Sequence, residues 1–171
     1  MEEFSHVLCL FCQTGKETGA IKHIERAGWG TAISPRKTRR VRDKNSWTED
    51  SAPLLPGYVF VYLTSEQAAY QFEMARLPQV IRVLGYGEGA GRFLTGADLE
   101  FARWVWQQGG RIGKIDVLET GDRVEITDSA FASLHGTIRK MDRRRQTLLV
   151  ELDEGNAIKS VWLPYHLVEK S

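Results

Sequence analysis

The chain has 171 residues, a net charge of +1, 42% hydrophobic residues and 26% charged residues. These proportions are typical of a soluble globular protein, and the length suits one domain or two small ones. No apolar run approaches the roughly 18 residues of a membrane span, and the acidic start is unlike a secretory signal. Two cysteines and no targeting segment favour a reducing compartment, so we expect a cytoplasmic protein without a membrane partner.

Residues 1–107 predict an α+β sandwich in which helices cover an antiparallel sheet. Val7–Cys12 is a continuous apolar run, as in a strand buried on both faces. A capping box of Thr14 and Glu17 predicts a helix that ends at Gly28. The other expected elements are a basic arm or edge hairpin at 30–44, a mobile loop at 44–52, a strand at 58–63, a helix capped by Thr64 and Gln67, a strand at 80–84 and a helix opened by Thr95 and Asp98.

Residues 108–117 are glycine-rich and polar, and we interpret them as a linker. Residues 118–171 then contain short alternating segments at close spacing, which is typical of a small five-stranded β-barrel. Phe131 is placed to fill the base of such a barrel. The expected strands are 122–127, 136–142, 147–153, 158–163 and 166–169.

Basic residues are concentrated in two runs, 36–44 and 139–145. Local clustering of this kind predicts a surface for phosphate groups, although a single run is also typical of a solvated strand or turn. Trp47, beside the first run, either stacks on a base or packs back on the domain. The candidate RNA-binding residues are Arg139, Lys140, Arg143, Arg144 and Arg145, and the candidates for a further nucleic-acid contact are Arg36, Lys37, Arg39, Arg40, Arg42, Lys44 and Trp47.

No catalytic or metal-binding constellation stands out in the sequence. Cys9 and Cys12 lie within an apolar strand, where side chains three residues apart point to opposite faces. This spacing predicts two buried core cysteines instead of a metal or redox pair. None of the four histidines lies in a zinc-protease motif or beside a nucleophile elbow. We therefore expect no enzymatic activity, no cofactor and no metal.

Several segments, in order along almost the whole chain, resemble the NusG family of transcription elongation factors. The block Leu55–Val61, LPGYVFV, is the most recognisable, and residues 121–138 resemble a KOW module. The resemblance implies a NusG-type N-terminal domain at 1–107, a linker at 108–117 and a C-terminal KOW barrel at 118–171. The other matching segments are Thr14–Glu17, Pro35–Lys37, Val80–Gly85 and Val161–Glu169.

In that family the N-terminal domain binds the clamp helices of RNA polymerase, largely through apolar residues. The resemblance maps this contact to Leu55, Pro56, Gly57 and Tyr58. A factor that holds the clamp closed disfavours pausing, which implies a role in transcription elongation or antitermination.

Two departures from the general pattern suit a specialised paralogue. Glu154, beside Asp153, stands where general members have an apolar loop tip, which argues against termination factor Rho and ribosomal protein S10 as partners. The run at 139–145 is richer in cations than a general factor needs. The chain therefore resembles the LoaP subgroup, which recognises an RNA hairpin and promotes antitermination at long operons, with RfaH-like and UpxY-like paralogues as alternatives.

The leading hypothesis is a monomeric antiterminator that binds RNA polymerase and an RNA hairpin. The cations at 36–44 would add contacts to RNA or to the non-template DNA strand. One alternative is a general elongation factor whose KOW module binds proteins and no specific RNA. The other is an RNA-binding module unrelated to polymerase.

Overall fold

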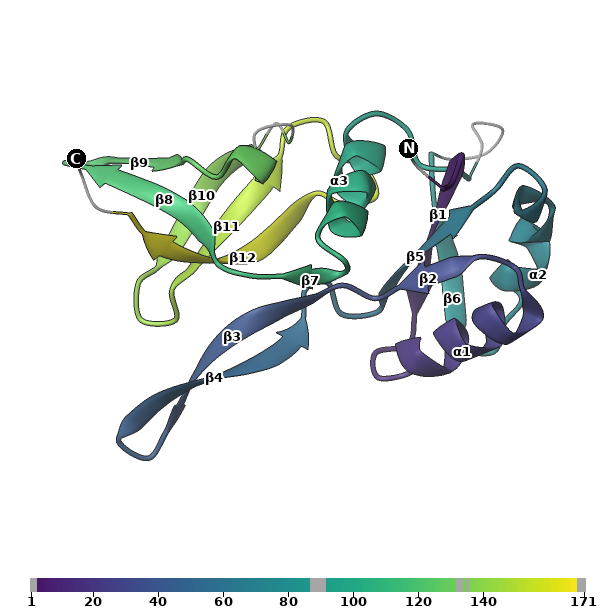
Figure 1. The fold of residues 1–171 in the computed structure, drawn as a ribbon, viewed down its shortest axis with the longest axis horizontal. Coiled ribbons are helices and arrows are strands. Elements are labelled where there is room, and N and C mark those ends of the chain that lie inside the picture. The colour runs from purple at the N-terminus through teal and green to yellow at the C-terminus, as the bar shows by residue number, and fades with distance from the viewer. Residues whose placement is uncertain (1–2, 87–91, 132–133, 135, 169–171) are drawn as a thin grey trace.

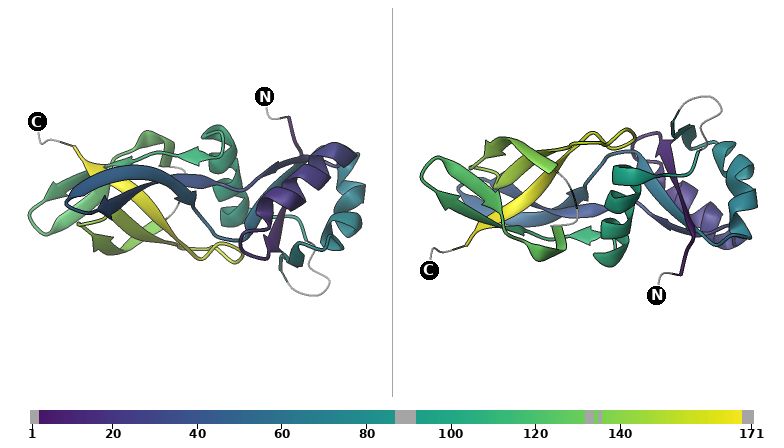
Figure 2. Two further views of the ribbon diagram at one scale, coloured as in Figure 1. Left: turned by 90° about the horizontal axis from the view of Figure 1, so that it is seen from below. Right: turned by 90° about the horizontal axis from the view of Figure 1, so that it is seen from above.

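The computed structural model describes residues 3–86, 92–131, 134 and 136–168. An α/β part and a curled β-sheet lie side by side, and a long hairpin from the first runs along the second (Figures 1 and 2). Positions 132–133, 135 and 169 of the KOW-like segments lie outside the described residues. Within the described ranges, no helix has the length and apolar character needed to cross a lipid bilayer.

The sheet of the α/β part has four strands in the order β2-β5-β1-β6. Its inner strands are β1 (His6–Cys12) and β5 (Tyr58–Leu63), which pair antiparallel. β6 (Val80–Leu84) pairs antiparallel with β1, and β2 (Thr31–Ile33) pairs antiparallel with β5. The apolar runs that predict central strands therefore form the centre of the sheet, and the predicted mixed α+β class is confirmed.

Helices cover both faces of this sheet (Figure 1). Alternate residues of β1 enter two different hydrophobic clusters, so Cys9 lies in one cluster and Cys12 in the other, as their spacing predicts. Burial of Cys9 raises the pKa of its thiol far above the usual range, which keeps this thiol protonated. The helices are α1 (Glu17–Ala27) and α2 (Gln71–Ala75), preceded by a 3-10 turn at Gln67–Tyr70, on one face, and α3 (Gly96–Gln107) on the other.

One of the two predicted capping boxes is present. Thr64 Oγ1 accepts a hydrogen bond from Gln67 N at 3.2 Å, and Gln67 Oε1 accepts one from Thr64 N at 3.0 Å. The box predicted at Thr14 and Glu17 is wrong, because α1 begins at Glu17 and has no side-chain cap. The Glu17 carboxylate instead accepts a hydrogen bond from Gly57 N at 3.2 Å.

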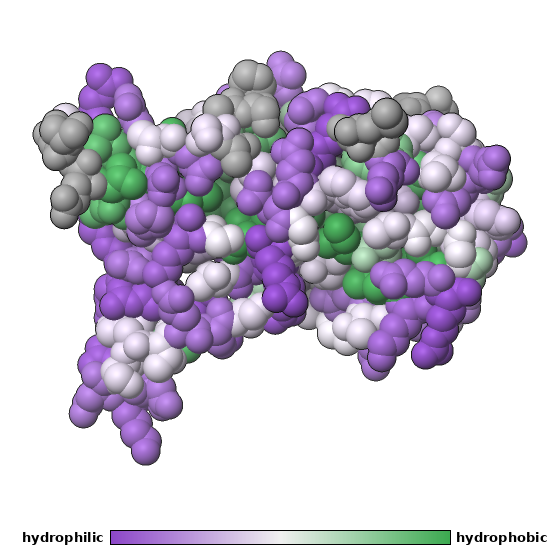
Figure 3. Space-filling view, viewed as in Figure 1, coloured by the Kyte–Doolittle hydropathy of each residue, from purple (hydrophilic) through white to green (hydrophobic). Residues whose placement is uncertain are grey.

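Residues 36–53 form a two-stranded hairpin with polar side chains over most of its surface (Figure 3). β3 (Arg36–Asp43) and β4 (Ser46–Pro53) pair antiparallel along their full length around the turn Lys44–Asn45. The mobile loop predicted at 44–52 is therefore wrong. Sequence pattern misses β4 because this strand has almost no buried face, so backbone pairing and cross-strand contacts stabilise it instead.

The C-terminal sheet has five strands in the order β10-β11-β12-β8-β9. The sheet is curled, and β9 and β10 are its two edges in the described residues, so it is open between them (Figure 1). The two last predicted strands are one strand, β12, and β8 lies in a stretch where no strand is predicted. The bounds are β8 (Ile115–Thr120), β9 (Arg123–Ile126), β10 (Gly136–Asp142), β11 (Thr147–Leu152) and β12 (Ser160–Leu167), with a 3-10 turn at Ser129–Phe131.

The stretch between α3 and β8 is ordered against the α/β part. Its short strand β7 (Arg111–Ile112) pairs parallel with the start of β3. Ile112 and Ile115 are 2% and 3% exposed. A Cβ on Gly110, which has φ of 77°, would lie 2.7 Å from the side chain of Ile33. The connection therefore packs tightly where it leaves α3.

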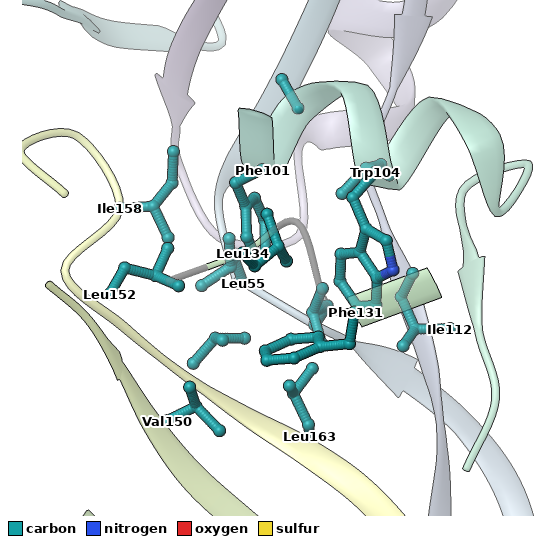
Figure 4. Close-up of a cluster of buried hydrophobic side chains, with 14 of the residues drawn as sticks. Leu55, Phe101, Trp104, Ile112, Phe131, Leu134, Val150, Leu152, Ile158 and Leu163 are labelled. Carbon is teal, nitrogen blue, oxygen red and sulfur yellow. The ribbon is translucent and has the colours of Figure 1, made fainter. Parts of the chain in front are cut away.

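One hydrophobic cluster continues from the α/β part into the C-terminal sheet (Figure 4). Phe101 and Trp104 of α3 point toward side chains of the C-terminal part. Phe131 stands edge-on to Trp104, with ring centres 5.5 Å apart and ring planes at 86°. The two parts thus share a core. The C-terminal members drawn beside α3 include Phe131, Leu134, Val150, Leu152, Ile158 and Leu163.

Candidate functional site

The turn before β5 carries the residues predicted to bind polymerase. Gly57 has φ of 88°, and a Cβ there would lie 2.7 Å from the carbonyl oxygen of Cys12. Cys12 N donates a hydrogen bond to the Gly57 carbonyl at 2.7 Å, while the Glu17 carboxylate accepts from Gly57 N. The turn is therefore fastened to both β1 and α1, and only glycine fits at this position.

The C-terminal part covers most of this turn. Leu55 is 8% exposed and belongs to the cluster shared with the C-terminal sheet (Figure 4). Tyr58 is half-buried, and its hydroxyl donates a hydrogen bond to the Ala157 carbonyl at 3.2 Å. Burial raises the pKa of the Tyr58 hydroxyl, so the phenol remains a neutral donor. Of the four predicted residues, Pro56 is exposed and the rest are buried or half-buried in this arrangement.

Asp98 of α3 holds the loop between β11 and β12 in place. The carboxylate is 1% exposed. Its two oxygens accept hydrogen bonds from the backbone N–H groups of Asn156, Ala157 and Ile158 at 3.0 to 3.1 Å, and from the Tyr86 hydroxyl at 2.7 Å. Hydrogen bonds to a buried carboxylate are among the strong ones. The sequence places Asp98 only at the start of a helix and carries no sign of this contact.

Two of the five predicted RNA-binding cations are neutralised within the protein. Arg139 donates to Glu151 at 2.9 Å, and Arg143 forms an ion pair with Glu119. The hydrogen bond and charge of Glu151 raise the pKa of Arg139, and the hydrogen bond from Arg143 lowers the pKa of Glu119. Both guanidinium groups are more than half exposed, and Glu119 is the least exposed partner at 27%, so the pairs orient the arginine side chains more than they stabilise the fold.

The other three cations of that run remain available. Lys140, Arg144 and Arg145 are exposed, and none has an ion pair within the described residues. The turn itself is shaped by Asp142, whose side chain accepts a hydrogen bond from Arg145 N at 3.0 Å. These three side chains are therefore free to contact an external anion.

Some cations of β3 are likewise neutralised by an ion pair within the protein, and others are not. Arg39 forms a bidentate ion pair with Asp50 across the hairpin, at 2.7 and 2.9 Å. Arg40 and Arg42 instead lie over the ring of Trp47, with guanidinium carbons 4.4 and 5.9 Å from its centre.

The cations at the two ends of the basic run 36–44 make other contacts than those in its middle. Arg36 Nε donates to the Ser51 hydroxyl at 2.8 Å, and Lys37 Nζ donates to the Trp162 carbonyl of β12 at 3.0 Å. Lys44 is exposed at the tip of the hairpin. Sequence reasoning thus finds the basic run, but not that its base contacts the C-terminal sheet.

Replacing Gly57 with alanine is expected to lower the free energy of unfolding by about 2–4 kcal/mol. A positive φ costs an alanine about 1–2 kcal/mol, and the contact with the Cys12 carbonyl forces a further backbone shift. Urea unfolding measures the loss. Gly15→Ala is the matched control, because Gly15 also has φ of 90° but nothing lies within 4 Å of an added Cβ. Equal losses in the two variants would show that the tight approach at Gly57 is unimportant.

Comparison with a family model indicates the family of this chain. The family model described as "Transcription termination factor nusG" matches residues 7–96, which is more than half of the chain. A solved structure described as "Domain interaction in Thermotoga maritima NusG" has 22% identity to the chain, covers 93% of both chains and has a TM-score of 0.49. A comparison with curated proteins found no match. On the match of the family model across its α/β part, this chain belongs to the NusG family of transcription factors.

Proposed function

We propose that the protein is a transcription elongation or antitermination factor that binds RNA polymerase through its α/β part and RNA through its C-terminal part. The RNA is a hairpin, as in the LoaP-like antiterminators of long operons that the sequence resembles. Residues 1–107 would form the polymerase-binding domain, 108–117 its connection, and 118–171 the KOW domain.

The observation that carries RNA binding is the set of uncompensated cations at the β10–β11 turn. Lys140, Arg144 and Arg145 are exposed and have no ion pair in the described part of the chain. Such cations bind phosphate oxygens and release counterions, so the affinity depends strongly on salt. Selectivity would come from the shape of a hairpin and its unpaired bases.

Polymerase binding is supported by the family and by the chemistry of the turn before β5. Leu55 and Tyr58 offer an aliphatic and an aromatic anchor on a turn that Gly57 makes rigid. The C-terminal part covers Leu55 and part of Tyr58, so polymerase can contact both side chains in full only after the C-terminal part moves away. Binding is therefore coupled to a change of arrangement, and its strength includes the free energy of that change.

The test of RNA binding is the triple variant Lys140→Ala/Arg144→Ala/Arg145→Ala. Each lost phosphate contact should reduce the slope of log affinity against log salt by about 0.7–0.9, which gives a reduction of about 2–3 for three contacts. The measurement is fluorescence anisotropy with hairpins from 5′ leaders of the source genome's long operons, at several salt concentrations and against random hairpins.

The control variant removes three exposed cations at the far end of the molecule from the turn. Wild-type salt dependence in this control, together with a loss in the turn variant, supports the proposal. Weak and unselective binding by the wild-type protein would contradict RNA recognition and favour a general elongation factor whose C-terminal part binds proteins. The control substitutions are Lys16→Ala, Lys22→Ala and Arg26→Ala.

A further inference from the structure

The hairpin and the β10–β11 turn meet in space, although they are far apart in sequence. Arg40 Nη1 donates a hydrogen bond to the carbonyl oxygen of Arg144, 104 residues away, at 3.0 Å. Lys37 ties the base of β3 to β12, and Glu49 of β4 pairs with Lys114 just before β8. The view from below shows β3 crossing β12 (Figure 2). The two basic runs therefore lie on one side of the molecule.

Two adjoining cavities lie between these elements. Their volumes are about 210 and 410 Å³, and both are lined by Arg40, Asp142 and Arg145. The smaller cavity reaches Trp162 and the larger reaches Trp47. Asp142 is the one carboxylate among the lining residues, and its Oδ1 already accepts a hydrogen bond from Arg145 N. The cations that line the pair of cavities are Lys37, Arg39, Arg40, Arg42, Arg144 and Arg145.

Several positive charges lie close together around these two cavities. Burial lowers the pKa of Lys37, and the nearby charge of Arg39 lowers it further. Arg40 and Arg42 share one face of the hairpin with Trp47, because Arg42 pairs directly with Trp47 in the strand register. The indole ring lies close to both guanidinium groups and holds them toward the larger cavity. An anion in the cavities would relieve the repulsion between these cations.

We propose that the hairpin and the β10–β11 turn form one composite cleft that binds successive phosphate groups of an RNA strand. This inference rests on the proposed RNA binding and adds the hairpin to the site. Guanidinium groups match phosphate oxygens, and two cavities side by side suit a chain of phosphates. Trp162 is 37% exposed at one end of the cleft and offers an aromatic face to an unpaired base.

The cleft exists only while the hairpin and the C-terminal sheet are packed together. When the C-terminal part leaves β5, Arg144 and Arg145 leave the hairpin, and RNA keeps only the contacts of the turn. RNA should therefore bind the packed arrangement more tightly than the open one, and by linkage it should favour packing.

The experiment compares RNA binding by the full chain and by Arg40→Ala/Arg42→Ala. The probe is a fluorescein-labelled RNA hairpin with an unpaired loop, measured by anisotropy over a range of salt concentrations. We expect about tenfold weaker binding and a salt slope lower by about 1.4–1.8, because two phosphate contacts are lost. Lys22→Ala/Arg26→Ala, which removes the same charge from exposed positions of α1, should bind as the wild-type protein does.

The outcomes separate this inference from the proposed function. If Arg40→Ala/Arg42→Ala behaves like the α1 control while the turn variant loses binding, the composite cleft is wrong and RNA binding by the turn stands. If neither variant loses binding, both proposals are wrong. Competition by polyglutamate at equal charge concentration should be weak, and equal competition would show a cleft for acidic polypeptides instead of RNA.

A second variant tests the dependence on packing. Asp98→Asn takes one carboxylate oxygen away from the backbone N–H groups of the loop at 156–158, which holds the two parts together. It leaves every cation of the cleft in place. Its affinity for the RNA hairpin should fall to that of Arg40→Ala/Arg42→Ala. Unchanged RNA affinity in a variant whose parts have separated, as shown by hydrogen exchange of the loop, would overturn the composite cleft.

Discussion

Replacing Asp98 with asparagine is expected to raise the affinity for RNA polymerase by about 10- to 100-fold. The carboxylate accepts hydrogen bonds from three backbone N–H groups of the loop at 156–158. The amide of asparagine has only one accepting oxygen, and its NH2 group would face N–H donors with which it cannot form a hydrogen bond. A buried donor without a partner costs about 1–3 kcal/mol, and every 1.4 kcal/mol changes a population tenfold. The open arrangement, in which Tyr58 is free, becomes correspondingly more populated.

Two measurements check this result. Hydrogen exchange at Asn156, Ala157 and Ile158 should become faster, and surface-immobilised polymerase should retain more of the variant than of the wild-type protein. Asp122→Asn is the matched control, because Asp122 is an exposed aspartate of the β8–β9 turn. Faster exchange without stronger polymerase binding would show that the covered turn is not the polymerase contact.

Much of the α/β part could be predicted because its two central strands are buried on both faces. Val7–Cys12 and Tyr58–Leu63 are apolar runs that pair at the centre of the sheet, so burial dictates their composition. The turn at Gly57 was also predictable, since proline followed by glycine marks a tight turn. The hairpin strand β4 was not, because it lies almost wholly in solvent and carries no hydrophobic period.

The packing of the two parts could not be predicted from the sequence. Asp98 looks like an ordinary acidic residue in the first turn of a helix, and its partners are backbone N–H groups, which leave no mark on residue type. Likewise, the sequence shows two basic runs, but nothing in either one indicates that Arg40 reaches the backbone of Arg144. Contacts across such separations depend on how β7 and β8 direct the chain after α3.

Replacing Phe131 with alanine is expected to lower the free energy of unfolding by about 3–5 kcal/mol. Phe131 is 3% exposed, and its removal leaves a cavity where the C-terminal sheet meets α3 (Figure 4). Urea unfolding of the full chain measures the loss. Phe72→Ala is the control, because Phe72 is 54% exposed and its truncation should change stability by less than about 1 kcal/mol.

A double-mutant cycle with Trp104→Ala then separates the interface from the C-terminal core. The two rings meet edge-on, so we expect a coupling free energy of about 0.5–1.5 kcal/mol between Phe131 and Trp104 in the packed arrangement. Adding Asp98→Asn to every corner of the cycle should reduce that coupling, because the rings separate when the loop is released. Coupling that persists in the Asp98→Asn background would mean that the shared core, and not the carboxylate, holds the two parts together.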